Sequence, residues 1–404
     1  MSNRAKRTRH DSAEPPAGPF ERWRHVGHAM VLGAALSHAT VARAQVSGTE
    51  PPFAGTVEGF ANLTGGVVAS PRGPAPAHVI KGRADIALRT FLRIESDNGF
   101  TFGPRVVVQT LGQSPLELGD RSIVLGTPWG RLELGYRQGL PDTLVGYAPN
   151  SYTFTGVEFG PPSGLNLFPH GGLQTSFLTP SVASAVGSLS YLGIATAFAG
   201  DFSRKLIYVS PRFLGLQLGL SGSSNADPTS FGADYGSSGQ AGLVHERYFG
   251  QNVLRIGGSY GFGYRRLADG VSGAPRELHS GNVGATLVLN DEWIFGASAS
   301  ADYAKRTLAL DDPSSGVGFG VTVSINRESG PWDVGGFLQQ AWRHNGSASP
   351  VRLLAGEVGA SYRLETRLRI YTAIYSFDLR DDNPVAIVTS ARGGVFLLGV
   401  RGQL

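Results

Sequence analysis

Apolar and polar residues alternate in short runs along most of this chain. In the run 317–325, every odd position is Val, Phe or Ile, and every even position is Gly, Thr or Ser. Successive side chains of a strand point to opposite faces, so a period of two predicts strands with one apolar face. From Gly55 onward no segment keeps a helical period over a convincing length. The pattern therefore predicts an all-β protein.

Sixteen runs of this kind can be counted, at 55–67, 83–95, 100–110, 119–127, 131–137, 204–211, 214–223, 240–249, 252–265, 278–290, 292–305, 316–327, 332–344, 352–364, 367–380 and 392–404. Short connections alternate with long ones. This alternation is typical of an outer-membrane barrel, in which a closed sheet satisfies every backbone group in lipid. We predict a transmembrane antiparallel up-and-down β-barrel with sixteen strands.

One connection, 138–203, is far longer than the others. It is rich in Gly, Ser, Thr, Pro and aromatic residues, and its acids are Asp142, Glu158 and Asp201. A segment of this length inside a compact protein usually has a function of its own, and its composition is too apolar for disorder. We expect it to fold inward as a constriction loop that narrows the lumen of the barrel.

The first 44 residues have the features of a signal peptide. Basic residues precede the short apolar run 28–36, and Ala42-Arg-Ala44 is a small-x-small cleavage site. We expect cleavage after Ala44 and a barrel over 45–404; a disordered basic tail is the alternative. Of the 35 basic and 31 acidic residues, 7 and 3 lie in this segment, leaving 28 of each. A neutral mature chain gives no reason to expect nucleic-acid binding.

The residues suggest neither a catalytic site nor a metal site. There is no Gly-x-Ser-x-Gly elbow, no pair of His residues with metal-ligand spacing, and no glycine-rich phosphate loop with its Lys. No run of about 18–20 apolar residues occurs, which excludes a membrane-spanning helix. We expect no enzyme activity and no cofactor.

Three stretches resemble the general porins of Gram-negative bacteria, which are trimers of sixteen-stranded barrels. Residues 120–138 resemble the strand, turn and strand before the constriction loop of that family, residues 203–220 resemble the hairpin after it, and 398–404 resemble the usual C-terminal strand. Two features differ from the family: the last residue is Leu404 instead of Phe, and the long loop is poor in acids.

The resemblance implies a constriction at which basic residues of the wall face acidic residues of the loop. Such charge rings select ions by sign. The candidate pore-lining residues are Arg83, Arg89, Arg93, Arg105, Arg131 and Arg137 on the wall, and Asp142 and Glu158 on the loop. The excess of arginines predicts a mild preference for anions. The alternative is that these arginines only brace the loop.

The resemblance also implies function and partners. We expect a homotrimer in the outer membrane that lets small hydrophilic solutes and ions diffuse passively. Its partners would be outer-membrane lipid, lipopolysaccharide and the barrel-assembly machinery. Three alternatives stay open: a channel selective for sugars or an anion, a barrel enzyme, and a structural barrel with a plugged lumen.

Overall fold

The computed structural model describes residues 53–72, 78–96, 98–111, 117–137, 203–224, 236–264, 277–305, 316–345, 350–381 and 390–403, and, within the long connection, residues 139, 140, 144, 186, 189, 191, 192 and 196–198. The expected signal peptide, 1–44, lies outside the described residues. Among the described residues, no helix is both long and apolar enough to cross a membrane.

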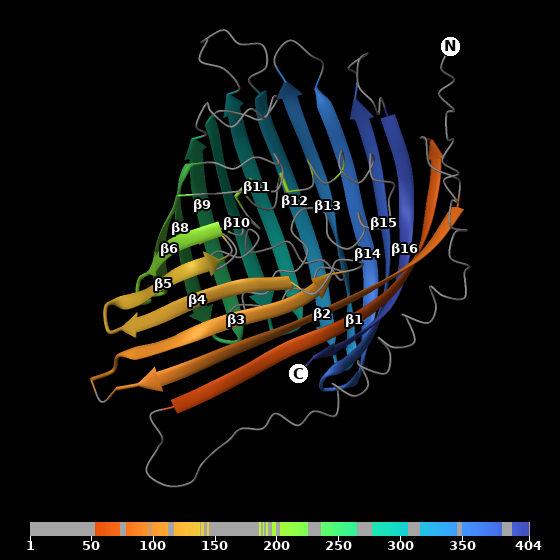
Figure 1. Cartoon of the computed structure of the whole chain (residues 1–404). Coiled ribbons are helices and arrows are strands. Elements are labelled where there is room, and N and C mark those ends of the chain that lie inside the picture. Colours follow the sequence, from red (N-terminus) through yellow and green to blue (C-terminus); the bar gives the residue numbers. More distant parts are fainter. Residues whose placement is uncertain are drawn as a thin grey trace, which may run out of the picture.

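The described chain forms sixteen strands: β1 (Phe53–Arg72), β2 (His78–Glu95), β3 (Thr101–Leu111), β4 (Glu117–Thr127), β5 (Gly130–Arg137), β6 (Ser203–Val209), β7 (Leu216–Ser223), β8 (Ser237–Phe249), β9 (Asn252–Tyr264), β10 (Glu277–Leu289), β11 (Trp293–Lys305), β12 (Gly316–Ser329), β13 (Trp332–Asn345), β14 (Val351–Glu365), β15 (Leu368–Asp381) and β16 (Ser390–Gln403). Each pairs antiparallel with its neighbours in sequence. β1 also pairs with β16, which closes the barrel (Figure 1). The predicted fold class is confirmed.

The two faces of the sheet differ as the alternation predicts. In β12 the outward side chains Val317, Val321, Val323 and Ile325 are exposed, whereas the inward Gly, Thr, Ser and Asn residues between them are buried. An apolar band on the outside is what a bilayer requires of a barrel. Aromatic pairs lie toward both ends of this band, with ring centroids 4.7 Å apart in Trp332–Tyr362 and in Phe319–Trp342.

One rim of the barrel carries tight turns. Glycines with positive φ occupy several of them, for example Gly250 between β8 and β9 and Gly330 between β12 and β13. Between β10 and β11 the positive φ falls on Asn290 and Asp291, residue types that tolerate the left-handed region. We call this rim, which carries the tight turns, the short-turn rim. The first residue of β1 and the last residue of β16 also lie at it.

The described residues of the 138–203 connection lie inside the barrel. Leu140 and Leu144 pack with the inward side chains of Ile207, Val209 and Val244 in one buried cluster. A larger cluster joins six residues of 186–198 to the inward faces of β10, β11 and β13–β16. These six residues are Val186, Leu189, Tyr191, Leu192, Ala197 and Phe198. Burial of apolar surface therefore holds the described parts of this connection against the inner wall.

Candidate functional site

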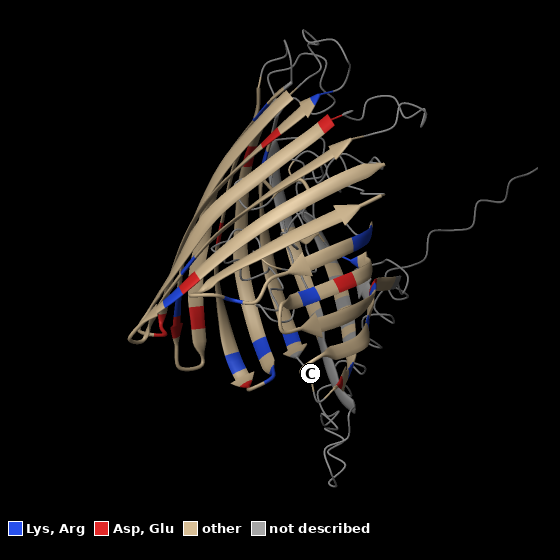
Figure 2. Cartoon of the chain, turned by 90° about the vertical axis from the view of Figure 1, so that its left-hand side faces the viewer, with Lys and Arg blue, Asp and Glu red and all other residues tan. Residues whose placement is uncertain are grey.

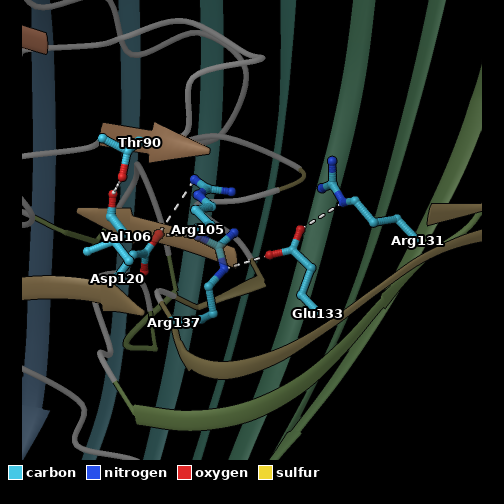
Figure 3. A network of polar contacts seen from close by, with 7 residues as sticks. All are labelled: Thr90, Arg105, Val106, Asp120, Arg131, Glu133 and Arg137. Atoms are coloured by element: carbon cyan, nitrogen blue, oxygen red, sulfur yellow. Dashed lines mark hydrogen bonds and ion pairs between the residues drawn. The ribbon is translucent and has the colours of Figure 1, made fainter. Parts of the chain in front are cut away.

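Charged side chains of β3, β4 and β5 meet on the inner wall in one network (Figure 3). Arg137 at the end of β5 contacts two acids: its Nη1 contacts Asp120 of β4, and its Nε lies 2.6 Å from Glu133 Oε2. The other oxygen of Glu133 lies 2.7 Å from Arg131 Nε. Arg105 of β3 completes the network, with Nη2 3.5 Å from Asp120 Oδ2. Three arginines thus share two carboxylates.

The exposure of these side chains decides which charge a solute meets. The carboxylates are buried, with 3% of the Asp120 side chain and 1% of the Glu133 side chain exposed, and Arg137 is buried as well. Arg131 is 45% exposed. The network therefore keeps its negative charge within the wall and presents a guanidinium to the water of the lumen.

Arg137 braces the start of the long connection. It is the last residue of β5, and its backbone oxygen accepts a hydrogen bond from Lys205 Nζ of β6 at 3.1 Å. Lys205 also donates to Ser203 Oγ at 2.6 Å. Since β5 and β6 flank the connection, these contacts tie its two ends together. The contact with Lys205 comes from the backbone oxygen of Arg137, so it does not depend on the guanidinium.

The remaining predicted site residues are not brought into this network by the described contacts. Arg93 of β2 pairs with Glu95 two residues away, and both side chains are about half exposed near the short-turn rim. Arg83 and Arg89 lie in β2, and their side chains are outside the described part of the chain. Asp142 and Glu158, the predicted acids of the loop, are also outside the described residues.

A second polar group anchors the connection on the opposite wall, and sequence reasoning did not single it out. The hydroxyl of Tyr191 donates to Asp302 of β11 and accepts from Arg343 of β13, and Arg343 also pairs with Asp302. Gln339 of β13 donates to the backbone oxygen of Leu192. Burial, helped by the Asp302 carboxylate, raises the pKa of Tyr191 well above its usual value, so its hydroxyl stays protonated. One feature of the sequence could have indicated this anchor: Asp302 is a charged residue on the same face of its strand as Ser298 and Ser300.

The glycines of the wall make room for this anchoring. A Cβ built on Gly261 of β9 would lie 2.6 Å from the ring of Phe198, which is closer than any real contact. Next to this ring, the backbone N–H of Ala197 donates to Ser280 Oγ at 2.8 Å. The absence of a side chain at Gly261 thus provides the space into which the connection inserts an aromatic ring.

A family model described as "Gram-negative porin" matches residues 29–382. The chain belongs to the Gram-negative porins. The porin is therefore an outer-membrane channel for diffusion. No curated protein sequence matches it significantly.

Solved structures share the fold of the porin at low sequence identity. An anion-selective porin from Comamonas acidovorans has a TM-score of 0.57 at 13% identity, covering 87% of this chain and 100% of that chain. OmpT of Vibrio cholerae, an outer membrane protein solved in a trimer form, has a TM-score of 0.54 at 10% identity, covering 87% of this chain and 99% of that chain. At these identities the likeness concerns the fold alone.

Proposed function

We propose that this porin conducts small hydrophilic solutes and ions by passive diffusion with a preference for anions. The observation that supports the preference is the unequal exposure within the network of β3–β5. The carboxylates of Asp120 and Glu133 are buried, whereas Arg131 reaches the lumen. A guanidinium remains charged at any working pH, so the preference would not depend on titration of the arginine.

Several finer features belong to the same proposal. The mature chain begins at Gln45, the barrels associate as homotrimers in contact with lipopolysaccharide, and the channel acts without a cofactor or covalent chemistry. The trimer form of the Vibrio cholerae protein supports the oligomeric state by fold analogy.

The test is the reversal potential of the refolded porin in a planar bilayer under a salt gradient. We expect permeability to chloride to exceed that to potassium. Two unit charges interact by about 1 kcal/mol at 4 Å in water, so Arg131→Gln should lower the permeability ratio by about two- to fivefold. Arg121→Gln is the matched control, because Arg121 points outward from β4 and lies 4.7 Å above the ring of Tyr136.

Either of two results would refute the preference: selectivity for cations in the unaltered porin, or equal permeability ratios in Arg131→Gln and Arg121→Gln. A folded barrel that never conducts would instead support the alternative of a plugged structural barrel. Conductance steps that come in threes would support the trimer.

A further inference from the structure

The inner wall carries a second set of arginines at the short-turn rim, on strands β14–β16. The register of the strands pairs Arg363 of β14 with Arg369 of β15, and Arg369 with Arg401 of β16. Three arginines therefore stand side by side across three neighbouring strands. Figure 2 shows Lys and Arg segments at the lower ends of neighbouring strands close to the C-terminus.

All three side chains point into the lumen. Arg369 reaches inward to Asp333, whose side chain is buried in the wall, with 3.7 Å between Nη1 and Oδ2. Arg401 lies over the ring of Tyr371, which is buried on the inward face of β15, with 5.5 Å from Cζ to the centroid. Arg363 has the same parity as the buried Ser361. Its neighbours Tyr362 and Leu364 face outward and are exposed.

Such an arrangement has an electrostatic cost. Side chains directly opposite each other in an antiparallel pair have Cβ atoms about 4.5–5.5 Å apart, and like charges at such positions are destabilising. Among the side chains that the structure describes, the acids that face the row are Glu328 and Asp333, on β12 and β13. Within this described group, three guanidiniums face two carboxylates. The separation of 3.7 Å between Arg369 and Asp333 is longer than a hydrogen bond, so the guanidinium keeps donor capacity for another acceptor.

The position of the row is also fixed by packing. The hydroxyl groups of Tyr371 and Thr64 contact each other across β15 and β1. A Cβ on Gly399 would lie 2.3 Å from the Tyr371 ring, so Gly399 leaves the space in which this ring lies. Tyr371 in turn supports Arg401 from one side. Neighbouring guanidinium groups held in place by packing are suited to bind oxyanions, because each can bind a phosphate or a carboxylate through two parallel hydrogen bonds.

We propose that Arg363, Arg369 and Arg401 form a binding site for a small oxyanion of the phosphate type in the lumen at the short-turn rim. The site rests on the proposed function only in that the lumen must be open to water and small ions. Its role is to hold an anion at one mouth of the channel, on strands other than those of the β3–β5 network. The bound anion offsets the repulsion within the row.

The experiment measures thermal unfolding of the refolded porin in detergent while inorganic phosphate replaces chloride at constant ionic strength. A ligand that binds only the folded state raises the unfolding temperature as its concentration passes the dissociation constant. We expect phosphate to stabilise the unaltered porin. In Arg369→Gln the apparent dissociation constant should rise by about tenfold or more, since a hydrogen-bonded charge pair is lost. Arg369→Lys, which keeps the charge without the fork, should give a smaller rise.

The matched control is Arg327→Gln, which removes the same charge near the same rim. Arg327 points outward, with its guanidinium 5.1 Å above the ring of Trp293, and this variant should keep the phosphate effect. The proposal is overturned if Arg369→Gln responds to phosphate as the unaltered porin does, or if Arg327→Gln loses the effect equally. Loss of the effect in Arg131→Gln would place the phosphate at the network of β3–β5 and would also overturn it.

Measuring the unfolding temperature tests the phosphate site independently of the proposed conduction of ions. Phosphate-dependent stability requires no conductance, so it can be measured even in a barrel that does not conduct. A porin with normal anion preference and no phosphate effect would refute the site alone. Folding of each variant is checked first by the heat-modifiable migration of the barrel on a gel. Arg369→Gln relieves repulsion within the row but removes a partner of the buried Asp333 carboxylate, so the phosphate effect of each variant is measured against its own unfolding temperature in chloride.

Discussion

Replacing Tyr191 by Phe should loosen the 186–198 part of the long connection without unfolding the barrel. The hydroxyl of Tyr191 contacts both members of the Asp302–Arg343 ion pair, and the ring is buried. The variant removes these two contacts but leaves the ion pair and the packing of the ring. The contacts within the strands are unchanged, so the loss falls on the attachment of the connection.

The size of the effect follows from the groups involved. A hydrogen bond to a charged group contributes about 1.5–3 kcal/mol, which corresponds to a factor of about 10–100 in an equilibrium constant. Asp302 and Arg343 keep each other as partners, so no buried charge is left alone and the larger cost of a broken ion pair does not arise. We expect the local opening of residues 189–198 to become about 10–100 times more frequent.

Hydrogen exchange of the backbone amides measures this opening directly. The amide of Ala197, which donates to Ser280, should exchange faster in Tyr191→Phe. Amides of β12 should be unaffected. Tyr303→Phe is the control, because Tyr303 is the residue after Asp302 on β11 but points outward. Equal protection of Ala197 in the unaltered porin and in Tyr191→Phe would refute the assignment of Tyr191 as an anchor.

Two further predictions concern charge. In Arg137→Gln the buried carboxylates of Asp120 and Glu133 lose their shared partner but keep Arg105 and Arg131, so the free energy of unfolding should fall by about 1.5–3 kcal/mol in a urea titration. Arg131→Gln should lose less than about 1 kcal/mol because Arg131 is half exposed, and equal losses would contradict the place of Arg137 at the centre of the network. Because burial raises the pKa of Tyr191, its protonated hydroxyl supports attachment fully below the usual tyrosine pKa of about 10 and loses this effect as pH rises through the raised value. Exchange at Ala197 should therefore accelerate in strongly alkaline buffer, and a pH profile identical to that of Tyr191→Phe would refute this linkage.

The strands could be predicted from the sequence because most of them have one apolar and one polar face. The run 204–211 does not show a clear alternation, and the structure gives the reason. Its outward Leu206 faces the bilayer, but its inward Ile207 and Val209 are apolar as well, since Leu140 and Leu144 cover them from inside the lumen. A contact from a distant segment removes the polar face on which the period-two signal depends.

The charged sites could be predicted only in part. Arg105, Arg131 and Arg137 could be predicted as wall residues, but the contact of Arg105 and Arg137 with Asp120 depends on how β3, β4 and β5 are aligned. A slip of one residue would turn every side chain to the other face, and the chain alone does not fix alignment between strands. The row of Arg363, Arg369 and Arg401 is hidden for the same reason: its members are dispersed in sequence and adjacent only in the register of β14–β16.

The pairing of β5 with β6 has a consequence for how the barrel forms. Seven residue pairs, from Arg131–Val209 to Arg137–Ser203, join strands that are separated by the long connection. Hairpins such as β8–β9 close over a turn of two residues and pair at once with their neighbour in sequence. The entropy cost of closing a loop grows with its length, and contacts between distant residues form slowly. We therefore expect two preassembled arcs, β1–β5 and β6–β16, to join late at two seams, one at β5–β6 and one at β1–β16. Packing of Leu140 and Leu144 against β6 would favour the pairing of β5 with β6, and the hydrogen bond from Lys205 Nζ to the backbone oxygen of Arg137 would stabilise it.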